Sequence, residues 1–362
     1  MKTATGSPSD TNSKSPFDHH PVANQIPKLR AVVTVIVATA LTSAAGAVTL
    51  VGKDDATVPA RLKVVDLIGE AGRDDGQFNE PTDVAFDTAG MLYVVDSRNL
   101  RIQRYNPNGE FETPFGRYGW KGEGLISPAG IAIDQELYIY VSDRERGLVH
   151  QYDIYGKYLK SFGQSDKVAT HFERPAGVAV DQLGNLWVTD TGNHKVKRLN
   201  ALGEITLELG YYGTDLGKLN LPSDVALDRN GRPFVADGGN SRLQSYDRFG
   251  NPLAVILQTG NESLRNPSAL CFDRFGNIFV SDAGNDRVVV FSPEGRFLGA
   301  TGKLGSGAKD FNHPGGLAFG PFGRLYVADT YNHVIKIIEV EYRLPDRVEK
   351  PPQAPELEDE EK

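Results

Sequence analysis

The sequence predicts an all-β protein in which six similar units of four antiparallel strands form a closed ring, a six-bladed β-propeller. Three observations lead to this fold class. A proline recurs at spacings of 45 or 47 residues, each proline begins the same apolar pattern, and one strand missing from the last unit is found before the first. A period of this length, with several short strands in each unit, is typical of propeller blades.

The first strand of each unit follows its proline. The prolines are Pro81, Pro128, Pro175, Pro222, Pro267 and Pro314. A small residue stands in the middle of the strand, where it lets neighbouring blades approach closely. These small residues are Ala85, Ala132, Ala179, Ala226, Cys271 and Ala318. We therefore interpret the single cysteine as a substitute for alanine in the core, and one cysteine allows no intrachain disulfide.

The second strand holds an aromatic residue and a valine in every copy, a pattern that predicts burial on both faces. An aspartate comes next, and in five copies an asparagine stands three residues later, with Arg146 as the exception. Both residue types bond nearby backbone groups and favour turns. The aspartates are Asp96, Asp143, Asp190, Asp237, Asp282 and Asp329. We expect them to pair with the basic residues Arg101, Lys195, Arg242 and Arg287.

The ends of the chain predict how the ring closes. Repeat six has no fourth strand, whereas Leu62–Ile68 resembles the fourth strands of other repeats and precedes the first proline. We infer that this segment completes the sixth blade, because joining the first and last segments removes an open sheet edge.

The repeated pattern, as in Asp190-Thr-Gly-Asn-His-Lys-Val196, resembles the NHL-repeat family over roughly residues 62–340. The resemblance implies a six-bladed propeller over residues 62–342 but no single activity. Members include extracellular sensor domains of bacterial kinases, RNA- and protein-binding modules of tripartite-motif proteins, and peptidylglycine amidating lyases. Repeat two departs from the pattern after its aspartate, either by drift or because it forms a functional surface.

The N-terminal region predicts membrane targeting. Residues 1–30 are interpreted as a disordered leader, and residues 31–52 as a hydrophobic helix that is either a transmembrane signal anchor or a cleaved signal peptide. The long leader favours the anchor, as in a bacterial-type membrane-anchored protein. Both alternatives place the propeller outside the cytoplasm, membrane-bound or secreted. Residues 343–362 form an acidic tail that we expect to be disordered.

The histidines argue against a zinc site. In the amidating lyases, zinc-binding histidines directly follow the blade-starting proline. The corresponding positions here are Thr82, Ala129, Ala176, Ser223, Ser268 and Gly315, none of them a histidine. His194 and His333 stand where the family pattern commonly has histidine, so a structural role is favoured.

Two carboxylates suggest a different cation. Asp83 and Asp224 lie two residues after the prolines of blades one and four, which are opposite each other in a six-fold ring. Ca²⁺ is the cation that such a pair would take at a channel mouth. A metal-dependent lyase or hydrolase with a site at this mouth is therefore the alternative to a binding function; no other cofactor is predicted.

The loops between blades differ from one another, and variable loops on a repeated scaffold are where recognition usually occurs. Their aromatic and basic residues are of the types found at binding hot spots. The candidates are Arg117, Tyr118, Trp120, Lys121, Tyr211 and Tyr212. These aromatic side chains either bind a ligand or pack under their own loops.

The composition limits the class of partner. The net charge is −8, with 39 basic and 47 acidic residues, which argues against broad binding of nucleic-acid phosphates. The sequence shows no nucleophile–base pair, phosphate loop or CxxC motif. It therefore favours an extracytoplasmic scaffold that binds a protein, peptide or glycan through its loop face, over an enzyme.

Overall fold

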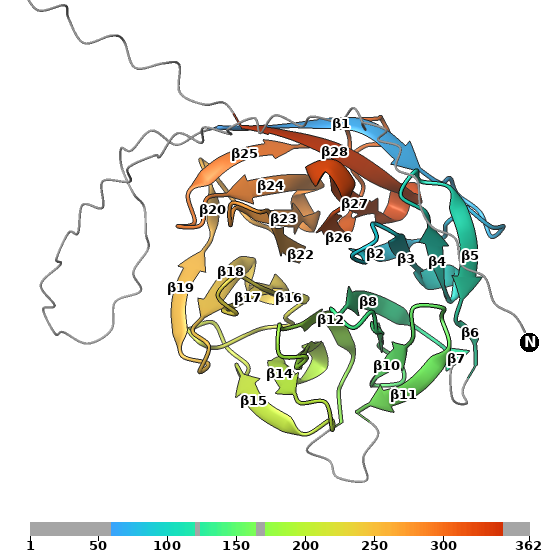
Figure 1. The fold of residues 1–362 in the computed structure, drawn as a ribbon. Helices are drawn as coiled ribbons and strands as arrows, with labels where there is room; N and C mark the ends of the chain where they lie inside the picture. The colour runs from blue at the N-terminus through green and yellow to red at the C-terminus, as the bar shows by residue number, and fades with distance from the viewer. Residues whose placement is uncertain (1–58, 120–123, 164–170, 343–362) are drawn as a thin grey trace, which may run out of the picture. The chain divides into compact units, whose positions relative to one another are not determined.

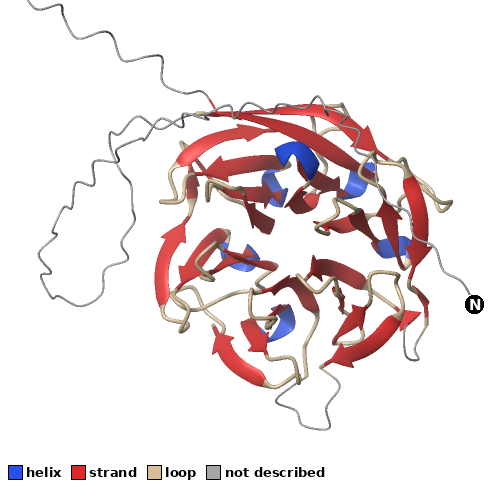
Figure 2. Cartoon of the chain, in the orientation of Figure 1, coloured by secondary structure: helices blue, strands red, loops and turns tan. Residues whose placement is uncertain are grey.

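The chain is a ring of six four-stranded antiparallel sheets (Figures 1 and 2). The computed structural model describes residues 59–119, 124–163 and 171–342. The leader, the hydrophobic segment 31–52 and the acidic tail lie outside these residues. Within the described part of the chain, no helix is both long and apolar enough to cross a membrane. The predicted fold class is confirmed.

In blades 1–5 the strands follow chain order from the centre of the ring outward, and in blade 6 the outer strand is β1. Blade 1 consists of β2 (Pro81–Phe86), β3 (Leu92–Asp96), β4 (Arg101–Tyr105) and β5 (Phe111–Phe115). Blade 2 consists of β8 (Pro128–Ile133), β9 (Ile139–Asp143), β10 (Leu148–Tyr152) and β11 (Tyr158–Phe162). Blade 3 consists of β12 (Pro175–Val180), β13 (Leu186–Asp190), β14 (Lys195–Leu199) and β15 (Ile205–Leu209).

The other three blades follow the same plan. Blade 4 consists of β16 (Asp224–Leu227), β17 (Pro233–Asp237), β18 (Arg242–Tyr246) and β19 (Pro252–Ile256). Blade 5 consists of β22 (Pro267–Phe272), β23 (Ile278–Asp282), β24 (Arg287–Phe291) and β25 (Phe297–Thr301). Blade 6 consists of β26 (Pro314–Phe319), β27 (Leu325–Asp329), β28 (Val334–Tyr342) and β1 (Ala60–Ile68). Two short ladders lie in loops, β6 (Arg117–Tyr118) with β7 (Gly124–Leu125) and β20 (Gln258–Thr259) with β21 (Glu262–Ser263).

The ring is closed by the two ends of the described chain. β1 runs antiparallel to β28, with Ala60 opposite Tyr342 and Ile68 opposite Ile335. The strand expected at Leu62–Ile68 is confirmed and begins two residues earlier. Blade 6 is thus built from segments that are more than 260 residues apart in the sequence (Figure 1).

The core lies between blades rather than within them. Six clusters of buried apolar side chains each join two neighbouring blades of the described chain. Between blades 3 and 4, for example, Trp187 and Val196 pack with Val225 and Val235. An apolar strand covered on both faces requires a neighbour on each side, and only a ring supplies one to every blade.

The meander gives the ring two different faces. The loops from the outer strand of one blade to the inner strand of the next, and the turns between second and third strands, lie on one side, which we call the loop face. The glycine-containing hairpin turns lie on the other side, the turn face. In blade 2 such a turn has Leu137 in place of glycine, at a φ of 66°.

Candidate functional site

The six turn aspartates fix the loop face. All six are completely buried. In each, one carboxylate oxygen accepts a backbone N–H from a residue 16 or 17 positions upstream in the preceding inter-blade loop, as Asn220 donates to Asp237 at 2.7 Å. The second oxygen accepts the amide of the turn asparagine in five blades. These bonds hold both the loop and the turn in place.

The expected ion pairs form in three blades and differ in a fourth. Arg101, Arg242 and Arg287 lie 2.7–2.8 Å from the turn aspartates of their own blades. Lys195 instead pairs with Glu208, and Lys197 takes its place beside Asp190 at 2.7 Å. In blade 6, Lys336 pairs with Asp329 in the same way. The expectation for Lys195 is wrong, because a lysine side chain reaches the aspartate from the buried position two residues further along the strand.

The two family-position histidines are structural. His194 and His333 adopt left-handed backbone conformations directly after the turn asparagine. The Nδ1 atom of each accepts a backbone N–H from the next blade, His194 from Leu221 and His333 from Glu80, both at 3.0 Å. Ser241 and Asp286 accept corresponding N–H groups in their blades. The structural role favoured by the sequence is confirmed.

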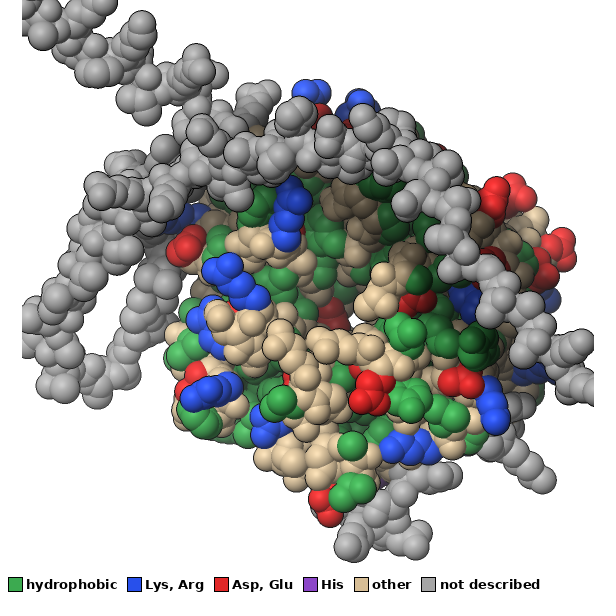
Figure 3. All heavy atoms as spheres, viewed as in Figure 1, with side chains coloured by type: hydrophobic (Ala, Val, Ile, Leu, Met, Phe, Trp, Pro, Cys, Tyr) green, Lys and Arg blue, Asp and Glu red, His purple; other side chains and the backbone are tan. Residues whose placement is uncertain are grey.

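A cavity of about 640 Å³ opens at the centre of the loop face. The first and second residues after the blade-starting proline line it in all six blades. The space-filling view shows one face of the ring, with an opening near its centre (Figure 3). The twelve residues are Thr82, Asp83, Ala129, Gly130, Ala176, Gly177, Ser223, Asp224, Ser268, Ala269, Gly315 and Gly316. Residues of all six blades thus converge on the channel mouth.

The wall of this mouth is joined from blade to blade by side chains. Thr82 donates its hydroxyl hydrogen to the carbonyl of Ala129 at 2.8 Å, and Ser223 and Ser268 donate to the carbonyls of Pro267 and Pro314. Each bond runs to the next blade around the ring. The hydroxyls of the wall are therefore structural.

Asp83 and Asp224 also bridge neighbouring blades. The Asp83 carboxylate accepts the N–H of Ile131 in blade 2 at 2.8 Å, and the Asp224 carboxylate accepts that of Leu270 in blade 5 at 2.9 Å. Each carboxylate lies against a glycine of the preceding blade, Gly316 and Gly177 respectively. The prediction that both line one channel mouth is confirmed, and their oxygens already accept backbone N–H groups.

Burial changes the protonation of these two carboxyls. Desolvation raises the pKa of Asp83 from 3.8 to about 7, against the opposing effect of its hydrogen bonds to Ile131 and Val84. Desolvation also raises the pKa of Asp224 well above 3.8, and the charge of Asp83 raises it further. Both carboxyls therefore hold protons at mildly acidic pH.

This shift predicts a pH dependence of folding. The folded chain keeps the Asp83 proton up to about pH 7, whereas the unfolded chain releases it near pH 3.8. The contribution of Asp83 to stability therefore falls as the pH rises from 5 to 8, by about 2–3 kcal/mol. Denaturant unfolding at both pH values should show that Asp83→Asn removes this part of the pH dependence. An identical pH dependence in the variant would contradict the raised pKa.

The rim of the mouth carries cationic and aromatic groups. Arg144 is exposed and lines the cavity, and within the described residues its side chain forms no hydrogen bond or ion pair. Desolvation and then Arg174 lower the pKa of its guanidinium. Tyr331, 49% exposed, stacks on His313 with ring centroids 5.2 Å apart, and Arg98 pairs with Glu80 at 2.9 Å. All of these except Arg174 line the cavity.

The loop residues singled out from the sequence lie away from this mouth. Tyr118, Tyr211 and Tyr212 are 60–69% exposed, so they do not pack fully under their loops. Tyr212 contacts the ring of His194, and Tyr211 lies under the Lys218 amine. Arg117 and Tyr118 line a separate shallow cavity beside blades 1 and 2. Trp120 and Lys121 lie outside the described residues.

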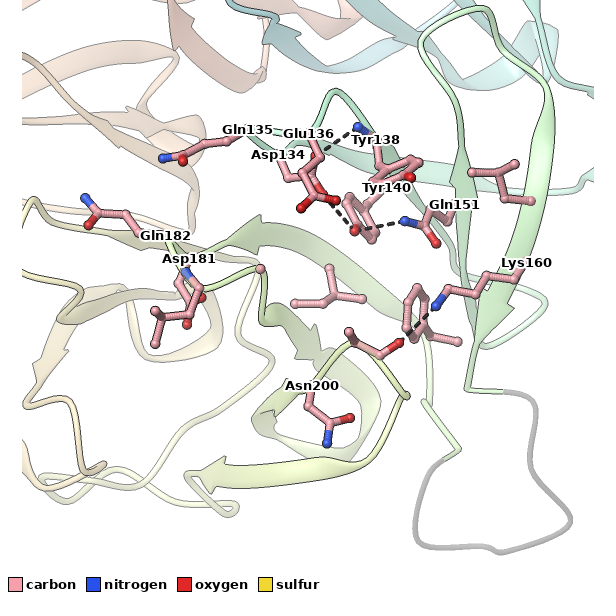
Figure 4. Close-up of a pocket in the computed structure, with 16 residues that line it drawn as sticks. Asp134, Gln135, Glu136, Tyr138, Tyr140, Gln151, Lys160, Asp181, Gln182 and Asn200 are labelled. Atoms are coloured by element: carbon pink, nitrogen blue, oxygen red, sulfur yellow. Dashed lines mark hydrogen bonds between the residues drawn. The ribbon is translucent and has the colours of Figure 1, made fainter.

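A second cavity, of about 510 Å³, lies between blades 2 and 3 near the turn face (Figure 4). Its polar groups bond one another. Asp134 accepts the hydroxyl of Tyr140, which accepts the amide of Gln151, and Lys160 donates to the carbonyl of Ala201 (Figure 4). Because these groups are already engaged, we interpret the cavity as a groove between blades and place the candidate site at the channel mouth.

Metal and thiol chemistry receive little support from side-chain positions. In the part of the chain that the structure describes, no three His, Cys, Asp or Glu side chains gather into a metal-binding group. Cys271 packs against the core between blades 5 and 6. Burial, and then the charges of Asp224, Asp273 and Asp83, raise the pKa of its thiol, so it stays protonated and a poor nucleophile.

These observations define a six-bladed propeller closed by its own ends, with a ligand-accessible mouth on the loop face. The NHL repeat family matches residues 78–105, 172–199 and 311–338, which cover the first three strands of blades 1 and 3 and most of the first three strands of blade 6. The chain is thus a six-bladed β-propeller that carries three NHL repeats. The matched segments do not include blades 2, 4 and 5.

Comparison with known proteins gives a fold and a short related segment. Over 60 residues, 17% of this chain, the sequence is 38% identical to Protein brain tumor of Drosophila melanogaster, and the match spans 6% of that protein's length. Streptogramin B lyase superposes with a TM-score of 0.56 at 12% identity, covering 80% of this chain and all of that one.

Two further structures share the fold. A putative gluconolactonase superposes with a TM-score of 0.56 at 17% identity, covering 79% of this chain and 95% of the other. An auxiliary nutrient binding protein from Bacteroides thetaiotaomicron gives 0.58 at 15% identity, covering 74% and 71%. At these identities the likeness concerns architecture alone, and it includes both enzymes and binding proteins.

Proposed function

We propose that the chain is a binding scaffold that holds a protein, peptide or glycan ligand over the channel mouth of the loop face. The observation that carries the proposal is the unpaired Arg144 beside Arg174 at the rim of a cavity on which all six blades converge. Two neighbouring guanidiniums repel each other. A ligand that brings a negative charge between them relieves this repulsion.

The ligand that fits best carries a carboxylate, phosphate or sulfate. An arginine binds such groups with two parallel hydrogen bonds, and the concave mouth strengthens them by excluding water. Asp83 and Asp224 lie deeper in the mouth, and their raised pKa values reduce their negative charge at mildly acidic pH. Tyr331 on His313 offers an exposed aromatic surface at the same rim.

The exposed tyrosines extend this surface. Tyr211, Tyr212 and Tyr118 lie on inter-blade loops and present most of their rings to solvent. Aromatic residues contribute much contact area with few rotatable bonds, so a large ligand gains by reaching them from the mouth. We also propose Arg117, Trp120 and Lys121, which are close to Tyr118 in the sequence, as residues that contact the ligand.

We also propose that the propeller lies outside the cytoplasm, attached through residues 31–52 or released after their removal. The proposal is supported by the uncharged run Ala31–Val51 and by the basic residues before it. Protease treatment of intact cells tests it, since the propeller of an external protein is cleaved while an internal control protein is not.

Replacement of Arg144 and Tyr331 should separate binding from folding. We expect Arg144→Ala combined with Tyr331→Ala to lower recovery of the bound partner at least about tenfold in a quantitative pull-down, because both side chains line the mouth. The variant should still fold, since both side chains are solvent-exposed and contribute little to the core. Tyr155→Ala and Leu202→Ala, which are exposed on the opposite face, are the control. Equal recovery by the mouth variant and the wild type would refute the mouth as the binding site.

A metal-dependent lyase or hydrolase is the second candidate, since Asp83 and Asp224 do line one cavity. Such an enzyme should purify with one tightly bound ion per chain, and Asp83→Asn with Asp224→Asn should release it. Metal analysis of the purified chain distinguishes this candidate from the first. A metal-free chain that still binds its partner would leave only the scaffold.

A further inference from the structure

The turn face carries large apolar side chains at the tips of its hairpin turns. Six of them are solvent-exposed in the described chain, from 51% at Phe275 to 94% at Phe322. Hairpin tips usually hold small or polar residues, which suit the backbone and the solvent. The six tips are Tyr155, Leu183, Leu202, Phe249, Phe275 and Phe322. All sit directly before a turn glycine.

Phe322 is the clearest case. Its backbone lies in the left-handed region, with a φ of 60° and a ψ of 15°, which disfavours a bulky side chain. The ring is almost fully exposed, so packing does not compensate for the strain. Asparagine or glycine would suit this position better on structural grounds alone. A phenylalanine here is therefore best explained by something that covers the turn face.

The charge of the turn face differs between its halves. The hairpin turns of blades 4–6 comprise residues 228–232, 247–251, 273–277, 292–296 and 320–324, with six basic and four acidic residues. The corresponding turns of blades 1–3 hold one basic and seven acidic residues. Arg248 and Arg274 lie over the rings of Phe249 and Phe275, 4.9 and 4.8 Å from their centroids. Aromatic and basic side chains thus gather on the same half.

Both ends of the described chain leave from this half of the turn face. Ala60 begins β1 opposite Tyr342, the last residue of β28. The Tyr342 ring contacts Phe275 in the turn of blade 5, with centroids 5.5 Å apart. Only residues 52–59 separate β1 from the hydrophobic run Ala31–Val51, and eight residues reach at most about 28 Å. A membrane anchored by that run would lie within reach of these turns.

We propose that Phe249, Phe275 and Phe322, with Arg248, Arg274 and Arg324, form a membrane-docking sector that holds the turn face against an anionic bilayer surface. The phenylalanines enter the interfacial layer and the arginines contact the lipid phosphates. The loop face with its channel mouth then points away from the membrane. The inference rests on the proposed membrane attachment and not on the ligand at the mouth.

A bilayer explains the sector better than a protein partner does. The three rings stand on three separate turns with polar turn residues between them. A protein interface is built around a contiguous, well-packed centre, whereas a fluid bilayer accommodates separate protruding anchors. In the hairpin turns of the sector, Asp228, Asp247 and Asp273 accept backbone N–H groups of their own turns, and Asp228 also pairs with Arg232. The side chains of Arg248, Arg274 and Arg324 are left as the outward charges.

Fluorescence quenching by brominated lipids tests the docking. The full chain is bound to vesicles of phosphatidylcholine with about one-third phosphatidylglycerol, with tryptophan at position 322, 202 or 212 in turn (F322W, L202W, Y212W). We expect quenching at 322 to exceed the wild-type background by at least about threefold, and none above background at 202 or 212. Quenching at 322 no greater than at 212 overturns the proposal.

A serine variant supplies the second test. F249S/F275S/F322S should cross-link to a photoactivatable phosphatidylglycerol at least about fivefold less than the wild type, while Y155S/L183S/L202S on the other half of the same face should match the wild type. Since all six side chains are exposed, melting temperatures should not fall. Equal cross-linking of both variants, as expected if a protein covers the sector, refutes lipid docking. If the full chain does not sediment with vesicles, both the docking and the membrane attachment are refuted. If the chain binds vesicles but position 322 is not quenched, the docking alone is refuted. Neither result bears on ligand binding at the mouth, which the pull-down with the mouth variant tests separately.

Discussion

Replacement of Gly316 by alanine should lower the free energy of unfolding by about 3 kcal/mol. A β-carbon at this position would lie 1.6 Å from the Asp83 carboxylate oxygen and 2.7 Å from the Asp83 α-carbon. The inner strands of blades 6 and 1 would have to separate at the channel wall, where Asp83 bonds Ile131 of blade 2. Chemical denaturation of the wild type and the variant measures the effect.

The neighbouring blades supply the control for this prediction. Blade 5 has Ala269 at the position that corresponds to Gly316, and the neighbouring blade 6 has glycine at the same position. Alanine is therefore tolerated in one blade when the next blade has glycine. The double variant Gly316→Ala with Asp83→Gly recreates that combination and should recover most of the lost stability. If the double variant is no more stable than Gly316→Ala alone, the contact with Asp83 is not the cause.

Removal of the Asp237 carboxylate should lower the free energy of unfolding by about 3–5 kcal/mol. This completely buried group accepts the Asn220 N–H at 2.7 Å and pairs with Arg242 at 2.7 Å. In Asp237→Ala the buried Arg242 loses its counter-ion and the inter-blade loop loses its anchor. Thermal and denaturant unfolding provide the measurement.

Two comparisons check that the effect comes from burial of the pair. Asp215→Ala removes an exposed ion pair with Lys218 and should leave stability unchanged within error. Arg242→Met combined with Asp237→Ala should cost less than the sum of the two single changes, because neither charge is then left alone. Additive losses would indicate that the two side chains are not coupled.

The repeat allowed most of the fold to be predicted from the sequence. Apolar alternation and turn residues are local signals, and they place the strands to within a residue or two, including the closing strand at Leu62–Ile68. The choice of Lys197 over Lys195 depends on the reach and direction of a side chain in three dimensions. The N–H groups that the turn aspartates accept come from far upstream and give no local pattern.

The site was predicted less completely than the fold. The positions of Asp83 and Asp224, two residues after the prolines of opposite blades, predict that both line the channel mouth, and they do. Arg144 lies in the segment where repeat two departs from the repeated pattern. That departure is the feature of the sequence that could have identified Arg144 as a site residue. Arg98 and Tyr331 occupy turn positions that vary freely among repeats, so only the ring shows that they meet above one cavity.

The pairing of β1 with β28 has a consequence for how the protein is made. Ile68, the last residue of β1, is synthesised 266 residues before Val334, the first residue of β28. At about 5–20 residues per second, synthesis of the intervening chain takes roughly 15–50 s. Throughout that interval a nine-residue strand with apolar positions such as Leu62 and Val64 has no partner, and it is open to association with other nascent chains or to protection by chaperones.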